Sequence, residues 1–171
     1  MKSRLFELFE TISEIPHASY QEKALSDYIK AFSEALTLEV SQDKYNNLLV
    51  KKPATPGYED APVVMLQAHL DMVAEKNMGS DHNFDTDPLE LIVEDGILRA
   101  NETTLGADDG VGVVYMMAIL EDKNLKHPAL ECVFTVEEEV GLVGAANFDT
   151  QNLKAELCVG LDSSGEDEVY V

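Results

Sequence analysis

Two segments near the start of the chain carry apolar residues at intervals of three or four, as one face of a helix does. The first stripe consists of Leu5, Leu8, Phe9, Ile12 and Ile15. The second consists of Leu25, Tyr28, Ile29, Phe32 and Leu36. Pro16 ends the first predicted helix, because proline disfavours helical backbone in the residue before it. Ser19 and Glu22 have the spacing of a capping box, which predicts the start of the second helix.

Short apolar runs in the rest of the chain predict strands. They cover residues 37–40, 46–50, 62–69, 89–93, 97–100, 130–136 and 157–161. The longer runs are almost continuously apolar, which is typical of interior strands buried on both faces, and we interpret 130–136 and 157–161 in this way. Glu94-Asp95-Gly96 separates two of the runs and predicts a tight hairpin. Residues 111–120 are apolar nearly all round, which indicates a buried helix that begins near Asp108 or Asp109.

The alternation of strands and helices predicts an α/β layered domain with a mainly parallel or mixed sheet. A length of 171 residues suits about one domain. Residues 166–171 resemble the entry into a further strand, with no closing helix behind them. We therefore expect the chain to stop inside its own architecture.

Charge excludes several classes of partner. With 12 Lys and Arg against 33 Asp and Glu, the net charge is −21, which offers no footprint for nucleic acid or an anionic membrane. The hydrophobic share of 45% excludes intrinsic disorder. The chain lacks the apolar core of a signal peptide and any run long enough to span a membrane. Cys132 and Cys158 form no C-x-x-C pair, so we expect a reduced, cytoplasmic protein without disulfides or thiolate zinc sites.

Acidic residues gather at the ends of predicted strands and at one helix start. The four places are His69-Leu70-Asp71, Gly106-Ala107-Asp108-Asp109-Gly110, Glu137-Glu138-Glu139 and Asp162. Sites in open α/β sheets lie outside the carboxyl ends of the strands, which makes these positions candidates for chemistry. Each place also has a plain structural interpretation when it is taken alone. These are a histidine satisfied by a nearby acid, helix-capping carboxylates, a solvated acidic face and a turn residue.

Taken together, the four places predict a metal site. Histidine with carboxylates suits zinc, manganese or cobalt, and a carboxylate shared by two ions would place them about 3.5–4 Å apart for metal-assisted hydrolysis. Three adjacent glutamates repel one another, and a cation would remove that penalty while leaving one glutamate free as a base. His17, His82 and His127 lie in loop-like contexts and are interpreted as structural or surface residues.

Five blocks of the sequence resemble the aminoacyl-histidine dipeptidases, a branch of the co-catalytic zinc aminopeptidase and aminoacylase superfamily. The blocks are Ile12–Pro16, His69–Val73 with Glu75–Asn77, Phe84–Pro88, Thr103–Asp108 and Glu138–Ala145, in the family's order. The resemblance extends from the first helix to Asp162. It implies a three-layer αβα catalytic domain with a mixed, largely parallel sheet, and a metal-dependent hydrolase of dipeptides, preferentially Xaa-His.

The resemblance also implies roles for individual residues. His69 and Asp162 would bind one divalent ion, Glu139 the other, and Asp108 would bridge the two; zinc is expected, with cobalt or manganese as alternatives. Asp71 would orient His69. Glu138 would be the general base that deprotonates the attacking water and returns the proton to the leaving amine. Glu137 remains an extra residue without a family role.

Two departures from the family distinguish this chain. No residue after Asp162 could serve as the family's last histidine ligand, and the family's lid and dimerisation domain is missing. We therefore expect residues 1–171 to be the N-terminal segment of a homodimeric enzyme, and the isolated chain to be inactive or weakly active. Two other functions stay open: hydrolysis of N-acyl-amino acids or tripeptides, and a non-catalytic fragment with a vestigial cation site.

Overall fold

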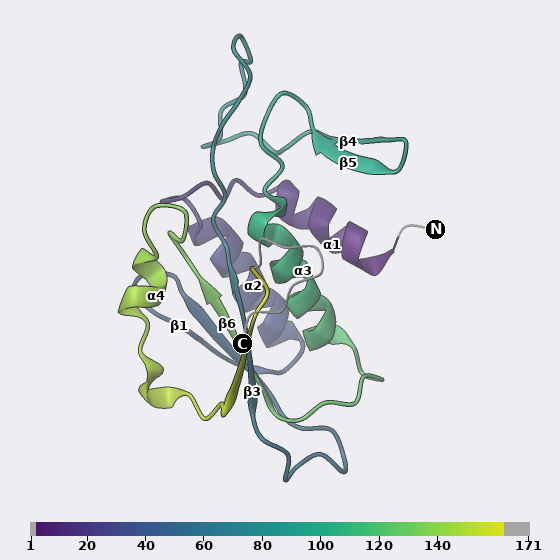
Figure 1. Cartoon of the computed structure of the whole chain (residues 1–171), viewed down its shortest axis with the longest axis vertical. Coiled ribbons are helices and arrows are strands. Elements are labelled where there is room, and N and C mark those ends of the chain that lie inside the picture. The colour runs from purple at the N-terminus through teal and green to yellow at the C-terminus, as the bar shows by residue number, and fades with distance from the viewer. Residues whose placement is uncertain (1–2, 163–171) are drawn as a thin grey trace.

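The computed structural model describes residues 3–162, which form a five-stranded sheet with helices packed against it and a separate two-stranded hairpin (Figure 1). The strands of the sheet are β1 (Glu39–Gln42), β2 (Leu48–Lys52), β3 (Val64–His69), β6 (Leu130–Thr135) and β7 (Leu157–Gly160). The hairpin consists of β4 (Leu91–Glu94) and β5 (Ile97–Ala100). The helices are α1 (Arg4–Ser13), α2 (Lys23–Ala35), α3 (Ala107–Glu121), α4 (Val143–Asn147) and the 3₁₀ turn η1 (Thr150–Asn152).

The strand order is β1-β2-β6-β3-β7. β3 lies between β6 and β7 and runs parallel to both, whereas β2 is antiparallel to β1 and to β6. The sheet is therefore mixed, as predicted, with parallel and antiparallel pairings equally represented among the described strands. β6 is buried at every position, whereas β7 is exposed along its whole length. The prediction of an interior strand at 157–161 is thus wrong for the described residues, because β7 pairs only with β3 there.

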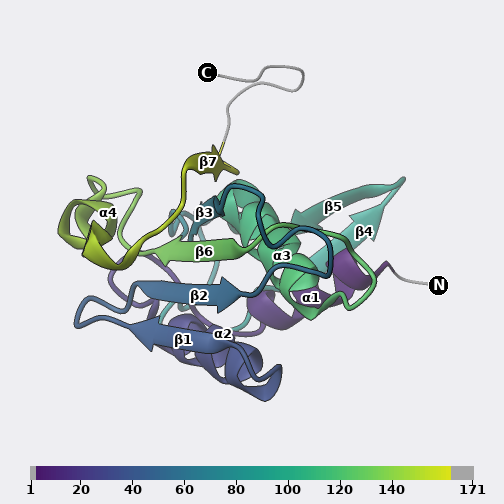
Figure 2. The same ribbon diagram turned by 90° about the horizontal axis from the view of Figure 1, so that it is seen from below.

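The core lies between the sheet and α1, α2 and α3, which pack on the same side of it (Figure 2). α3 has an apolar sequence on most of its surface, and it packs against both α1 and β3. Its Met116 and Met117 are fully buried. Glu131 of β6 attaches the segment 148–156 to the sheet. Its carboxylate accepts hydrogen bonds from the backbone N–H groups of Lys154 at 2.8 Å and Ala155 at 2.9 Å. This connection leads the chain from α4 to β7.

Most predicted elements are confirmed, with boundaries that differ by at most four residues and coincide for β5. The hairpin turn is confirmed in detail, since Asp95 and Gly96 both have positive φ, as a tight two-residue turn requires. Sequence analysis missed α4, because five residues are too few to show helical periodicity. The strand predicted at 166–171 lies outside the described residues.

The capping box predicted at Ser19 and Glu22 is wrong. α2 begins at Lys23, its N-cap residue Glu22 already has helical backbone angles, and no side chain caps the helix. The Ser19 hydroxyl instead donates to Asp71 Oδ2 at 2.8 Å, and Glu22 Oε1 accepts the N–H of Glu137 at 3.0 Å. Both residues therefore connect the segment before α2 to loops that follow β3 and β6.

A buried asparagine fixes the loop that follows β6. Asn47 is 1% exposed, and its amide donates to Gly144 O at 3.1 Å while its Oδ1 accepts the N–H of Val136 at 3.1 Å. Gly144 sits so close to this network that a Cβ atom there would collide with Val136 O and Asn47 Oδ1. The contact requires glycine and holds both ends of the loop 136–144 in place.

We predict that Gly144→Ala lowers the free energy of unfolding by about 1–3 kcal/mol, because the added methyl group overpacks a buried contact. Urea unfolding measures the difference. Gly160→Ala is the matched control, since its Cβ would meet only Gln67 Oε1 at 3.7 Å, and it should leave stability nearly unchanged. Equal effects of the two substitutions would contradict the importance of this contact.

Candidate metal centre

His69 ends β3, and its imidazole is contacted by carboxylates at both ring nitrogens. Nδ1 lies 2.9 Å from the backbone oxygen of Asp71 and 3.4 Å from its Oδ1. Nε2 lies 3.0 Å from Asp108 Oδ1. Because the ring is only 1% exposed, its orientation is fixed, and Nε2 is directed at the groups that follow neighbouring elements.

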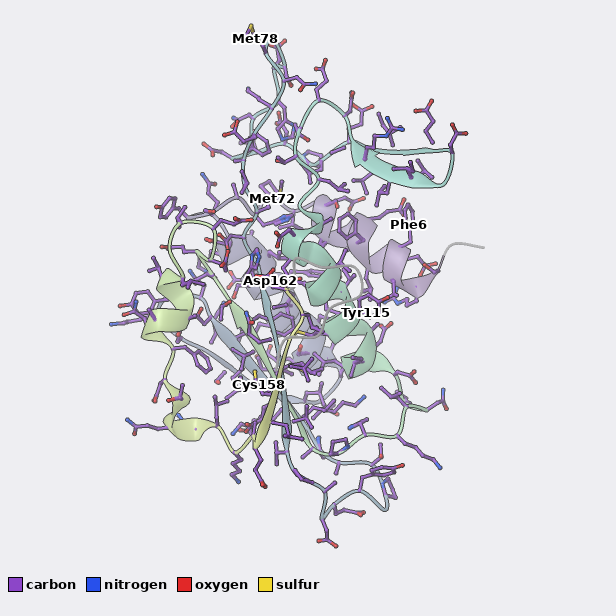
Figure 3. The ribbon with its side chains drawn as sticks, viewed as in Figure 1. Phe6, Met72, Met78, Tyr115, Cys158 and Asp162 are labelled. Carbon is purple, nitrogen blue, oxygen red and sulfur yellow. The ribbon has the colours of Figure 1, made fainter. Side chains whose placement is uncertain are left out.

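The first candidate cluster consists of His69, Asp108 and Asp162, which offer ligand atoms that all lie within 4.8 Å of one another. Asp108 stands at the start of α3, after Gly106 in the left-handed region. Asp162 follows β7, as Figure 3 shows. Its Oδ2 lies 4.0 Å from His69 Nε2. Parallel strands end at the same edge of a sheet, which is why the ends of β3 and β7 bring residues 93 positions apart together.

The second candidate cluster consists of His69, Glu138 and Glu139, again within 4.8 Å. β6 is parallel to β3, so the glutamates that follow it reach the same edge. The backbone N–H groups of Glu138 and Glu139 donate to Asp71 Oδ1 at 2.9 Å and Oδ2 at 3.2 Å. The structure therefore brings every candidate site residue into one region, with Glu137 beside it as an additional acid.

Asp71 is a buried hub of hydrogen bonds. Burial raises its pKa, but hydrogen bonds from His69, the N–H of Glu138, the hydroxyl of Ser19 and the N–H of Glu139 outweigh it, so the pKa is lowered. The carboxylate is therefore ionised at neutral pH. The spacing of Asp71 from His69 predicts a contact between the two side chains, but no local pattern in the sequence predicts that Asp71 also holds the loop after β6.

The electrostatics of the region favour a cation. Burial lowers the pKa of His69, but hydrogen bonds with Asp71 and Asp108 and the surrounding negative charge outweigh it and raise the pKa to about 10. The pKa of Glu139 is raised by burial and then by the charge of Asp108. An imidazole held positive and carboxylates that repel one another both indicate unbalanced negative charge, which a divalent ion would neutralise.

Asp109 also lies beside the two clusters, and the sequence did not predict its buried position next to His69. It is 3% exposed, its Oδ1 accepts the N–H of Gly112 at 3.1 Å, and its Oδ2 accepts the N–H of His69 at 3.3 Å. Burial raises its pKa to about 7. The peptide bond between Asp108 and Asp109 is cis. The sequence left two interpretations of this acidic pair, helix capping and metal binding. Asp109 bonds to the first turn of α3, as capping requires, whereas Asp108 faces His69, as a metal site would require.

The remaining histidines lie outside both clusters. Among the residues that the structure describes, His69 is the only histidine in a group that could hold a metal. His17 and His127 are buried, with Nδ1 at 2.6 Å from Ile15 O and 2.7 Å from Pro128 O. His82 contacts the Phe84 ring edge-on, with centroids 4.6 Å apart. These contacts agree with the structural interpretation of all three.

The described fold and this cluster define the class of protein: a three-layer α/β fold of the kind that peptidase catalytic domains have. The chain belongs to peptidase family M28, whose family model matches residues 47–169. The cytosol non-specific dipeptidase of Escherichia coli K12 is 40% identical over 98% of this chain and 34% of its own length. The resemblance to aminoacyl-histidine dipeptidases and the predicted fold class are thereby confirmed.

Solved structures give the same result. The aminoacylhistidine dipeptidase of Vibrio alginolyticus superposes with a TM-score of 0.92 at 39% identity, covering 95% of this chain and 33% of that one. A tripeptidase from Staphylococcus aureus superposes with a TM-score of 0.80 at 26% identity, covering 95% and 43%. The chain thus spans about a third of the dipeptidases that it matches. None of the helices within residues 3–162 is both long and apolar enough to cross a membrane.

We predict that Asp71→Asn lowers the free energy of unfolding by about 3 kcal/mol, because it removes a buried charge while its donors stay in place. The lowered pKa of Asp71 gives stability that is present above the usual carboxyl pKa and lost as the pH falls, so the difference should shrink below about pH 4. Urea unfolding at several pH values measures it. The exposed Asp60→Asn is the control, and a similar loss there would contradict the role given to Asp71.

Proposed function

We propose that the protein to which this segment belongs hydrolyses dipeptides, Xaa-His preferentially, in a metal-dependent reaction. The observation that carries the proposal is the convergence of His69, Glu138, Glu139 and Asp162, at the ends of β3, β6 and β7, with Asp108 at the start of α3. The dipeptidase names of two relatives at 39–40% identity support the substrate class. The word cytosol in one of these names supports the expected cytoplasmic location.

The donor set suits two divalent cations. His69 and Asp162 would hold one ion, Glu139 the other, and Asp108 would lie between them. Histidine nitrogen with carboxylate oxygens is a set that zinc accepts, as do cobalt and manganese. Such ions activate water at neutral pH and polarise a peptide carbonyl when bound.

The residues of this chain would supply the remaining chemistry. Asp71 fixes the His69 ring, so that Nε2 keeps one direction through a catalytic cycle. Glu138 is half-buried, and its backbone is held while its carboxylate reaches toward the cluster. In the proposed reaction, Glu138 would accept a proton from the attacking water and return that proton to the departing amine.

Glu138→Gln in the full-length protein should lower kcat by about 10²–10⁴-fold while zinc content stays unchanged, because an amide cannot accept the proton. Glu137→Gln is the matched neighbour and should keep nearly full activity. Steady-state hydrolysis of glycyl-histidine, with elemental analysis of each variant, measures both effects. If Glu137→Gln is the inactive variant, the roles along this acidic run shift by one residue.

Removal of metal should abolish hydrolysis, and zinc, cobalt or manganese should restore it. His69→Ala should lose at least one ion per chain, because His69 is common to both clusters. Chelator treatment followed by metal titration tests this expectation. Full activity of metal-free protein would contradict the proposal.

Substrate comparison separates the proposed reaction from its alternatives. The two dipeptidase relatives match more closely than the tripeptidase, at 39–40% against 26% identity, which favours dipeptides over tripeptides. Glycyl-histidine, glycyl-leucine, a tripeptide and an N-acyl-amino acid form a sufficient panel. Equal rates for the first two would retain the dipeptidase and reject the Xaa-His preference.

A further inference from the structure

Three successive backbone N–H groups in the loop after β6 donate to buried carboxylates. The N–H of Glu137 donates to Glu22 Oε1 at 3.0 Å. Those of Glu138 and Glu139 donate to the two carboxylate oxygens of Asp71 at 2.9 Å and 3.2 Å. Residues 137–139 include the proposed base and one proposed metal ligand. The backbone of each of these three residues is thus restrained by a hydrogen bond to a buried carboxylate.

Glu22 is itself fixed in place. It is only 3% exposed, its Oε1 also accepts the N–H of Tyr20 at 3.1 Å, and its backbone oxygen accepts the N–H of Ser26 in the first turn of α2. Glu139, by contrast, is exposed. A buried, fixed acceptor such as Glu22 restricts the backbone of the loop 137–139, and therefore the positions that the side chains of this loop can reach.

Ser19 fixes the second carboxylate. Its hydroxyl donates to Asp71 Oδ2 at 2.8 Å, and its backbone N–H donates to Met72 O at 3.3 Å. The adjoining Ala18 and Met72 form a parallel bridge, and the N–H of Met72 donates to His17 O. The segment before α2 is therefore attached both to the residues after β3 and to the loop after β6.

We propose that Glu22 and Ser19 are positioning residues, which hold the backbone of residues 137–139 so that Glu138 and Glu139 face His69. This inference rests on the proposed function for its catalytic consequence. Its structural content, the restraint on three consecutive amides, stands independently of the reaction. Glu22 accepts the N–H of Glu137 in this loop, and Ser19 donates to the Asp71 carboxylate that accepts the next two amides, so each residue restrains the loop in addition to its own segment.

The test uses Glu22→Ala, Glu22→Gln and Ser19→Ala in the full-length protein. Glu34→Ala is the control, because Glu34 is an exposed glutamate on α2, the helix that Glu22 precedes. Hydrogen exchange of the amides of residues 137–139 reports the restraint directly. In Glu22→Ala the Glu137 amide should exchange about tenfold faster or more, and kcat for glycyl-histidine should fall about 10–100-fold with little change in KM. Glu22→Gln keeps an acceptor oxygen and should stay within about threefold of the parent.

Each outcome decides between the alternatives. Unchanged exchange at residues 137–139 in Glu22→Ala, or faster exchange with undiminished kcat, would overturn the positioning role. If Glu22→Ala does not fold, Ser19→Ala takes its place, with faster exchange at residues 138–139 and lower kcat expected. If the parent protein hydrolyses no dipeptide, the proposed function fails, and the exchange data with zinc affinity at the Glu139 site still decide the positioning role.

Discussion

The arrangement of the site depends on one buried carboxylate, that of Asp71. It lies two residues beyond the end of β3, contacts the ring of His69 and accepts hydrogen bonds from the loop that follows β6. Hydrogen bonds from His69, two backbone amides and Ser19 lower its pKa despite its burial. A buried anion is stable only when its partners stay in place, so each of these segments constrains the others. The orientation of His69 and the path of the loop after β6 are consequently set by the same group.

The sheet topology supplies the second constraint. β6, β3 and β7 are parallel, so their carboxyl ends meet at one edge, and residues from three distant parts of the chain converge there. His69, Glu138, Glu139 and Asp162 gather in this way, and Asp108 joins them from the start of α3. Burial and then the charge of Asp108 raise the pKa of Glu139, and hydrogen bonds with Asp71 and Asp108 raise the pKa of His69 despite its burial. Such an arrangement is costly for a protein by itself and becomes favourable when cations share the region.

Much of this organisation is predictable from sequence because it depends on local patterns. Apolar runs ending in acids located β3, β6 and β7 and the residues after them, and Asp-Gly located the hairpin turn. Hydrogen bonds between residues far apart in the sequence leave no such local pattern and could not be predicted. Ser19 and Glu22 have the spacing of a capping box, yet their partners are Asp71 and Glu137, 52 and 115 residues away. The exposure of β7 likewise depends on which strands lie beside it, and a short apolar run carries no signal of that.

The proposed function requires that this edge of the sheet bind divalent cations. Anomalous X-ray diffraction at the zinc absorption edge, from crystals of the full-length protein grown with zinc, locates such ions directly. Two peaks are expected about 3.5–4 Å apart, one beside His69 and Asp162, the other beside Glu139, with Asp108 between them. No peak at this edge, or zinc bound only at other residues, would show that the site is not a metal centre.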